Sequence, residues 1–281
     1  MKGVIIAAGY GTRFLPGTKT IPKEMFPLVD TPAIQLIVDE FIAAGIKDIL
    51  IVTSRRKKSL EDFFDREVEL ENVFSSEGAD SKLSLIAPAK ANIFFSRQME
   101  MKGTGHAILQ CKPFVGNEPF VVAYPDDIVF ADMPLAAQLI SVYERTGCSV
   151  LAAQEIADDV SRYGVLDCKE ENGILRVSAI VEKPAVGTEP SHTISIGRFL
   201  FTSDFLSLLE EDYKTHSGKE FYHIGAINGL AKAGKMCALR FDGQRIDVGD
   251  RLGYIEGIIR YALTRDDLKA GTLQIMKNIV K

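Results

Sequence analysis

The sequence predicts an α/β protein with a doubly wound, mostly parallel sheet and a mixed, more antiparallel second lobe. In the first half, short apolar runs that suit buried strands alternate with amphipathic patterns that suit helices. In the second half, strand patterns follow one another at close spacing before helices return. Such a sheet binds ligands at the carboxyl ends of its strands, so functional residues are expected at that edge.

The first strand is expected at residues 4–8, an apolar run with β-branched residues at its start that Gly9 closes. The first helix opens at Thr31-Pro32, keeps its apolar residues on one face and stops at Gly45. The other elements expected in this half are a strand at 48–53, a helix at 54–65, an irregular stretch at 68–91, a strand at 92–98, a short helix at 103–111, a strand at 120–124 and a helix at 134–145.

In the second half, Glu171-Asn172-Gly173 suits a hairpin turn between two strands. The expected elements are strands at 149–155, 164–168, 174–183 and 194–201, helices at 203–213 and 224–233, a strand at 236–241, and two helical segments from residue 250 to the end. No linker rich in Pro, Gly or Ser and no repeat interrupts the chain. We therefore expect one domain over residues 1–281, with lobes at about 1–130 and 131–250 and C-terminal helices at about 250–281.

The composition is that of a soluble globular protein. The chain has 281 residues, of which 46% are hydrophobic and 25% charged. We expect a cytoplasmic protein without membrane association, because no long apolar run or signal peptide is present. A net charge of -5 argues against nucleic-acid binding. The four cysteines are scattered without zinc spacing, so we expect reduced thiols.

The loop after the first strand combines glycines with cations. Gly9 and Gly11 allow main-chain N–H groups to approach a phosphate, and Arg13, Lys19 and Lys23 supply positive charge. This pattern is typical of a site that cradles a polyphosphate.

Two familiar glycine loops do not fit this stretch. Gly11 and Gly17 are separated by five residues, not the four of a P-loop, and Thr18-Lys19 follows them. Phe14 stands where a dinucleotide fingerprint needs its third glycine, which disfavours a nicotinamide dehydrogenase. Residues that break helices recur here, namely Pro16, Gly17, Pro22 and Pro27. We expect the loop to wrap its ligand in extended form.

Two carboxylates are candidate metal ligands. Asp126 follows an apolar strand and would reach the carboxyl edge of the sheet beside the glycine loop, and Asp247 stands just before a helix. Two carboxylates, completed by phosphate oxygens and water, suit Mg²⁺ bound with a nucleotide. Asp127 or Asp250 are alternative ligands, although Asp250 is better placed to cap the last long helix.

Several tempting residues have ordinary interpretations. The run Arg55-Arg56-Lys57-Lys58 is interpreted as a solvated helix face. The four scattered histidines, His106, His192, His216 and His223, are not predicted to be general bases. No nucleophile with a paired base is visible, so a covalent mechanism is not indicated.

Motifs along nearly the whole chain resemble those of one enzyme family. They are Gly9-Tyr-Gly-Thr-Arg-Phe-Leu-Pro, Pro22-Lys23-Glu24, Arg97-Gln98, Gly103-x-Gly105-His106-Ala107, Pro125-Asp126, Tyr163-Gly164-Val165, Val181-Glu182-Lys183-Pro184, Gly197-Arg198-Phe199 and Leu252-Gly253-Tyr254. Together they resemble the sugar-1-phosphate nucleotidyltransferases, and specifically the bacterial enzymes that join UTP to glucose 1-phosphate. The resemblance implies a Rossmann-like fold of nucleotidyltransferase type, with a nucleotide-binding first lobe and a sugar-binding second lobe.

The resemblance also implies roles for individual residues. The nucleotide would be held by Ala7, Ala8, Gly9, Gly11 and Thr12, with Gln98 and Gly103 at the uracil edge. Arg13 and Lys23 would grip the triphosphate, while Asp126 and Asp247 would hold Mg²⁺. The glucose would contact Gly164, Glu182 and Gly197, and its phosphate would contact Lys183. The catalytic set would be Arg13, Lys23 and Lys183, and His106 would support the base pocket.

The implied reaction converts UTP and glucose 1-phosphate into UDP-glucose and pyrophosphate, by in-line attack of the sugar phosphate on the α-phosphorus. The resemblance further implies a homo-oligomer, either a dimer or a tetramer. A nucleotidyltransferase for another base or sugar, and a non-catalytic sugar-nucleotide sensor, are alternatives.

The chemistry of these side chains is consistent with the implied roles. An amide such as Gln98 can match the uracil edge with one donor and one acceptor. Neighbours on a strand point to opposite faces, so a joint role for Glu182 and Lys183 requires a twist or a strand end, for which Pro184 is suggestive.

Two departures from the family pattern concern the sugar side. Residues 220–227 stand where the family has a Leu-Thr-Asp-Ala type of segment, so that Gly225 replaces an acidic residue. Val248 stands where a cysteine is usual. These changes put the far wall of the sugar pocket and the subunit contacts in doubt.

Overall fold

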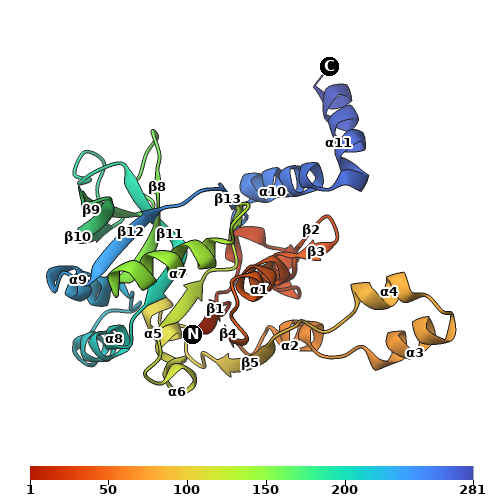
Figure 1. The fold of residues 1–281 in the computed structure, drawn as a ribbon, viewed down its shortest axis with the longest axis horizontal. Coiled ribbons are helices and arrows are strands. Elements are labelled where there is room, and N and C mark those ends of the chain that lie inside the picture. Colours follow the sequence, from red (N-terminus) through yellow and green to blue (C-terminus); the bar gives the residue numbers. More distant parts are fainter. Residues whose placement is uncertain (281) are drawn as a thin grey trace.

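A nine-stranded sheet runs through the computed structural model, which describes residues 1–280 (Figure 1). The strand order is β5-β4-β1-β6-β11-β8-β12-β10-β9. The strands are β1 (Lys2–Ile6), β4 (Asp48–Thr53), β5 (Asn92–Arg97), β6 (Phe120–Ala123), β8 (Ser149–Glu155), β9 (Gly164–Glu171), β10 (Ile174–Glu182), β11 (Thr193–Phe201) and β12 (Met236–Arg240).

The sheet changes character at β11. The first-half strands β5, β4, β1 and β6 are all parallel to one another. β11 is antiparallel to both β6 and β8, and β10 is antiparallel to β9 and β12. Asn172 and Gly173 join β9 to β10 with φ angles of 53° and 73°, the positive values that a tight hairpin turn requires. The predicted fold class and hairpin are both confirmed.

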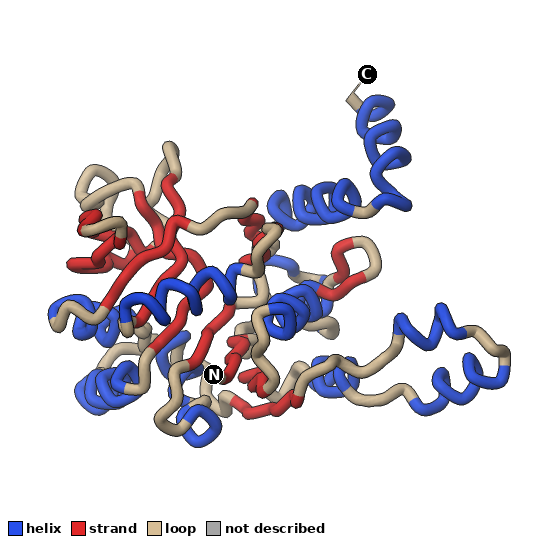
Figure 2. Tube along the Cα trace, viewed as in Figure 1, coloured by secondary structure: helices blue, strands red, loops and turns tan. Residues whose placement is uncertain are grey.

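Helices cover both faces of the sheet (Figure 2). Val4 and Ile5 are both fully buried, but they point to opposite faces and belong to different hydrophobic clusters. The cluster around Ile5 includes α1 (Ala33–Ala43) and α7 (Leu135–Thr146). The cluster around Val4 includes α5 (Thr104–Leu109), α6 (Lys112–Val115), α8 (Asp204–Thr215) and α9 (Ile224–Lys232). Burial on both faces explains why β1 is continuously apolar from Val4 onward.

Two helices lie in the stretch that was expected to be irregular. After α2 (Lys58–Phe64), the chain forms α3 (Val68–Ser76) and α4 (Asp80–Leu85), which extend away from the sheet (Figure 1). Neither of these helices has a buried residue, so the sequence carries no strong apolar face to reveal them. The prediction of an irregular segment at 68–91 was therefore wrong.

Smaller elements complete the fold. Thr31 and Pro32 form β3 (Thr31–Pro32) against β2 (Pro27–Leu28), so α1 begins one residue later than expected. β7 (Asp127–Phe130) pairs with β13 (Gln244–Asp247), with Asp127 opposite Asp247. The chain ends in α10 (Arg251–Thr264) and α11 (Asp266–Ile279), which confirms the two C-terminal helical segments. Among the described helices, none has the length and apolar character needed to span a membrane.

Candidate active site

The glycine loop is a series of short turns. It forms three 3₁₀ helices, η1 (Thr12–Phe14), η2 (Gly17–Lys19) and η3 (Lys23–Met25), so the expectation of an extended loop was wrong. Pro16 and Pro22 directly precede η2 and η3. Proline prevents a long helix, but its fixed φ also favours the start of a short turn.

Gly11 is the residue that requires glycine in this loop. Its φ is 68°, and a Cβ there would lie 3.2 Å from the Thr18 side chain. The Thr18 hydroxyl donates to the Gly11 carbonyl at 2.8 Å, which closes the loop on itself. Gly9, by contrast, faces open space, because a Cβ there would meet no atom within 4 Å. The predicted need for special backbone geometry therefore holds at Gly11, while Gly9 leaves room for a ligand.

A buried lysine pins the loop to the sheet. Lys57 is only 5% exposed, and its Nζ donates to the two Glu24 carboxylate oxygens at 2.7 and 2.8 Å. The same Nζ donates to the Ala7 carbonyl at 2.5 Å. Burial lowers the pKa of Lys57, against the opposing effect of Glu24. The interpretation of residues 55–58 as a solvated face was wrong for Lys57 and correct for its three exposed neighbours.

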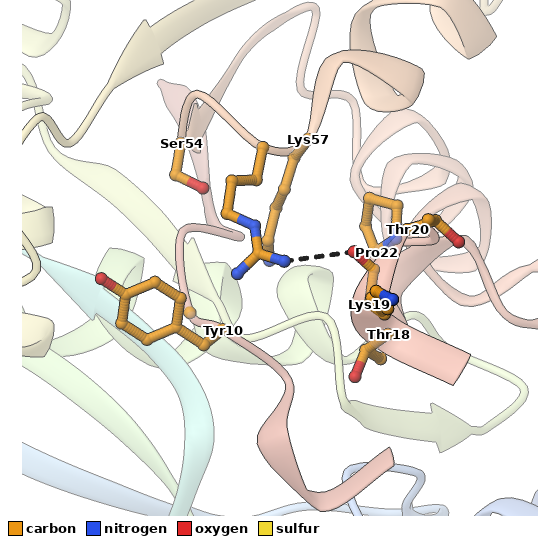
Figure 3. A pocket seen from close by; sticks show the side chains of 9 residues that line it. Tyr10, Thr18, Lys19, Thr20, Pro22, Ser54 and Lys57 are labelled. Atoms are coloured by element: carbon orange, nitrogen blue, oxygen red, sulfur yellow. Dashed lines mark hydrogen bonds between the residues drawn. The ribbon is translucent and has the colours of Figure 1, made fainter. Parts of the chain in front are cut away.

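A small pocket lies between this loop and the end of β4 (Figure 3). It is lined by Gly9, Tyr10, Thr18, Lys19, Thr20, Pro22, Ser54, Arg56 and Lys57. Arg56 donates to the Lys19 carbonyl at 3.1 Å, so the guanidinium is bonded to the loop that lines the pocket. Both Arg56 and Lys19 are exposed cations. The pocket thus combines positive charge with the open backbone at Gly9.

Ala7 and Ala8 are buried directly after β1. The Ala7 N–H donates to the Val52 carbonyl at 2.8 Å, and its own carbonyl accepts from Lys57. A nucleoside contact through Ala7 would therefore rely on the second lone pair of that carbonyl.

Gln98 directly follows β5, and its side chain is held in one orientation by contacts at the start of α5. It is 4% exposed, and its Nε2 lies 3.0 Å from both the Gly103 carbonyl and His106 Nδ1. Because a carbonyl can only accept, the amide nitrogen must face Gly103. Both amide hydrogens are thereby used, so Gln98 offers a ligand only its Oε1 acceptor. The expectation that Gln98 supplies one donor and one acceptor is corrected, while the predicted supporting position of His106 agrees with the contact.

Gly103 brings the backbone close to a distant segment. Its φ is 94°, and a Cβ would lie 2.5 Å from the Phe221 carbonyl. Gly105 N–H donates to that same carbonyl at 2.9 Å. Only glycine fits at residue 103 without a backbone shift.

Asp126 and Asp247 converge at the carboxyl edge of the sheet. A Cβ on Gly249 would lie 2.7 Å from Asp126 Oδ2 and 2.9 Å from Asp247 Oδ1. Lys23 forms an ion pair with Asp126. Burial acts to raise the pKa of Asp126, but Lys23 outweighs it and the pKa is lowered. Burial, followed by the nearby charge of Asp127, raises the pKa of Asp247.

Asp127 and Asp250, the two alternative metal ligands, have other roles in the fold. Asp127 pairs with Arg245 at 2.5 Å and accepts from the Gly197 N–H at 2.7 Å. Asp250 accepts from the first backbone N–H groups of α10, as predicted for an N-cap. Within residues 1–280, no group of three or more His, Cys, Asp or Glu side chains could hold a metal by itself.

Arg13 reaches the same edge from η1. Its guanidinium lies 3.5 Å from the Gly249 carbonyl, beside the two carboxylates. Its own carbonyl accepts from Arg251 at 3.1 Å. Thr12 is exposed beside it. The loop cations Arg13 and Lys23 therefore both lie next to Asp126, as expected of neighbours in a phosphate site.

A cavity of about 320 Å³ opens beyond these carboxylates. Its wall includes Arg13, Asp126 and Asp247 together with Gly164, Glu182, Lys183 and Gly197. β10 ends at Glu182, and Lys183 has a φ of 48°. This turn allows both side chains to line one cavity, which confirms the expected strand end. Burial raises the pKa of Glu182, against the effect of Lys183.

Sequence reasoning missed several residues of this cavity. They are Thr104, Tyr124, Arg162, Tyr163, Tyr222, His223 and Arg245. Arg245 lies 5.7 Å from the centre of the Tyr163 ring and pairs with Asp127. Tyr163 and Thr104 stand within family motifs, but neither was assigned a role of its own, and the register of β7 with β13 that brings Arg245 in has no strong sequence signal.

The two departures from the family pattern have structural explanations. A Cβ at Gly225 would collide with the Asp212 carboxylate of α8, so Asp212 takes the space that a side chain at 225 would need. Val248 is buried and packs close to Gly257 of α10. Tyr222, His223 and Ile224 line the cavity, so the segment 220–227 does form one of its walls.

Comparison with known proteins shows the enzyme family to which the chain belongs. The family model described as nucleotidyl transferase matches residues 2–262, and the chain belongs to this family. UTP–glucose-1-phosphate uridylyltransferase 1 of Staphylococcus saprophyticus is 42% identical, with 100% of this chain and 99% of that protein aligned.

Solved structures extend the comparison. A UDP-glucose pyrophosphorylase complexed with UDP-glucose has 41% identity and a TM-score of 0.83, covering 94% of this chain and 99% of that one. The UTP-bound enzyme from Acinetobacter baumannii has 33% identity and a TM-score of 0.88, covering 98% of each chain. The predicted family and fold are thereby confirmed.

Proposed function

We propose that this protein transfers the uridylyl group of UTP to α-D-glucose 1-phosphate and forms UDP-glucose and pyrophosphate. The observation that carries the proposal is the convergence of two kinds of site on one cavity. Arg13 and the two carboxylates line this cavity, with Lys23 paired to Asp126, and Glu182 and Lys183 line it too. Full-length relatives that carry the name of this reaction support it.

The uracil would be recognised through the Gln98 oxygen. Uracil has an N–H donor at N3, whereas cytosine has an acceptor there, so a fixed acceptor at Oε1 favours uracil. The Gly103 main chain lies beside this amide and is the second proposed contact of the base. Ala8, Gly9 and the loop through Gly11 and Thr12 would hold the rest of the nucleoside and its phosphates.

Asp126 and Asp247 fit a divalent cation that a nucleotide helps to hold. Their carboxylates converge, and their hard oxygen donors with few protein ligands suit Mg²⁺. When bound, Mg²⁺ would neutralise negative charge on the phosphates. Asp247 is well oriented for this role, because one of its oxygens already accepts from the Gly249 N–H at 2.9 Å.

The remaining chemistry is positioning and charge stabilisation. An oxygen of the sugar phosphate would form a bond to the α-phosphorus of UTP, and the bond to pyrophosphate would break. Arg13 and Lys23 would contact the triphosphate, while Lys183 would contact the sugar phosphate. Burial acts to lower the pKa of Lys23, but Asp126 outweighs it and the pKa is raised, so this lysine stays charged. Gly164, Glu182 and Gly197 would hold the sugar.

The organisation of the protein is part of the same proposal. Residues at about 1–130 would form the nucleotide lobe and those at about 131–250 the sugar lobe of one domain, because the cavity lies where parallel strands give way to antiparallel ones. A homo-oligomer and a cytoplasmic location stay predictions.

A matrix of nucleoside triphosphates against sugar 1-phosphates tests the function through pyrophosphate release. We expect release only when UTP, glucose 1-phosphate and Mg²⁺ are all present. A response to another base or sugar would replace the proposed specificity, and binding of UDP-glucose without any turnover would indicate a sensor instead.

A further inference from the structure

Three polar side chains in the acceptor cavity have no part in the reaction proposed above. They are Thr104 at the start of α5, Tyr124 just after β6 and His223 just before α9. All three line the same cavity as Glu182 and Lys183. The proposed sugar contacts Gly164, Glu182 and Gly197 line it as well, whereas Gln98 does not, so we assign this group to the sugar side.

The Tyr124 hydroxyl is an unsatisfied group in this cavity wall. It is buried and has no hydrogen-bond partner among residues 1–280, although Thr104 lies close to it. A buried polar group without a partner costs on the order of 1–3 kcal/mol. The hydroxyl is enclosed by the wall, so it makes this part of the wall polar without itself facing a ligand.

His223 is packed in a fixed orientation beside Tyr124. The residue is 6% exposed, and its ring stands edge-on to Tyr124 and Phe199, with ring centroids 6.2 and 5.2 Å away. Its Nδ1 lies 3.3 Å from the Thr104 hydroxyl. Its Nε2 makes no hydrogen bond to a described residue and is not fully buried, and His223 lines the cavity.

The chemistry of this imidazole suits a neutral ligand group. Burial lowers the pKa of His223 to about 4, so the ring is neutral near pH 7. A neutral imidazole offers one donor and one acceptor without charge. It therefore suits a hydroxyl better than a phosphate, for which the cavity already has Lys183 and Arg13.

We propose that His223 is a specificity-determining residue that binds one ring hydroxyl of the acceptor sugar through Nε2, next to the Tyr124 hydroxyl. The inference rests on the proposed function, because the sugar is that of the sugar 1-phosphate. It also assigns a role to the segment 220–227, in which this chain departs from the family pattern.

The experiment combines His223 variants with sugar variants. His223→Leu removes both ring nitrogens, His223→Asn retains only a group near Nδ1, and His223→Gln retains one near Nε2. Each is assayed by pyrophosphate release with glucose 1-phosphate and with its 2-, 3-, 4- and 6-deoxy analogues. His192→Leu, at an exposed histidine, is the control. UTP binding to each variant, measured by calorimetry without sugar, reports whether the fold is intact.

We expect His223→Leu and His223→Asn to raise KM for glucose 1-phosphate about 3- to 10-fold, the usual effect of losing one neutral hydrogen bond. His223→Gln should restore most of the loss, and UTP affinity should not change. With one deoxy analogue the difference between wild type and His223→Leu should vanish, which identifies the hydroxyl.

Two results would overturn this inference. An equal loss with all four deoxy analogues would mean that the ring only supports the cavity wall, and an unchanged KM would mean that it has no role. Failure of the proposed function is distinguishable, because wild-type protein would then release no pyrophosphate with any glucose derivative, and the inference would fall with it.

Discussion

The nucleotide side and the acceptor side of the cavity hold their charges differently. On the nucleotide side, Lys57 is buried against Glu24 and Lys23 is paired with Asp126. On the acceptor side, the Lys183 side chain is 56% exposed and lies 3.7 Å from Glu182. In the first region, ion pairs formed within the protein hold a loop in place. In the second region, the ammonium group of Lys183 stays available to a ligand. The difference indicates that the loop is preorganised for the nucleotide, and that Lys183 gains its strong partner only with the acceptor.

The largest effect on the free energy of unfolding is expected when the buried ion pair of the nucleotide side is broken. Lys57→Met should lower the free energy of unfolding by about 3–5 kcal/mol, because it leaves the Glu24 carboxylate buried without a counter-charge. Lys58→Met, at the exposed neighbour, is the control and should change it by less than about 0.5 kcal/mol. Urea denaturation measures both. Similar values for the two variants would remove the contrast between the two sides.

On the acceptor side, the buried neutral His223 should make the folding stability of the protein sensitive to acid. Unfolded histidine takes up a proton below about pH 6.5, but folded His223 does so only near its pKa of about 4. Stability should therefore fall as the pH drops from about 6.5 to about 4, by up to roughly 3 kcal/mol from this residue.

His223→Gln should flatten that part of the stability profile in urea titrations at a series of pH values. The matched control is His192→Gln, whose profile should follow that of the wild type. A His223→Gln profile that keeps the full acid dependence would place its origin elsewhere.

The boundary between the two sides can be tested at the carboxylates. Asp247→Asn should leave the fold intact, reduce kcat by about 100-fold or more and raise the Mg²⁺ requirement, since the amide keeps the shape but loses the charge. Asp250→Asn is the control, because asparagine also caps helices. If Asp126→Asn has this effect and Asp247→Asn does not, the second ligand is misassigned.

The smallest effects are expected from variants of Lys183 and Lys23, which compare the two sides directly. Lys183→Ala should raise KM for glucose 1-phosphate about tenfold, the value of a charge-assisted hydrogen bond to phosphate, and leave UTP binding nearly unchanged. Lys23→Ala should impair UTP binding, turnover or both. Calorimetry with UTP alone compares them. An equal loss of UTP affinity in both variants would contradict the division into two sides.

Local signals account for what the sequence determined by itself. The β1 run fits burial on both faces, Asn172-Gly173 makes the hairpin, and Asp250 caps α10, because each depends on residues a few positions apart. The family motifs likewise pointed to Gln98, Asp126 and Glu182, of which Asp126 and Glu182 line the cavity, and their roles stay predictions. The strand, the hairpin and the helix cap can be predicted from spacing and residue type, whereas the motif residues depend on the family resemblance.

Only the tertiary structure decided which side chains become buried partners. Lys57 meets Glu24 from 33 residues away, and Arg245 meets Asp127 across 118 residues through the pairing of β7 with β13. Gln98 loses its free donors to Gly103 and His106, and His223 joins the cavity through its packing on Tyr124 and Phe199. The sequence pattern of a charged or polar residue is the same whether it faces water or a distant partner, and the energy of burial depends on that partner.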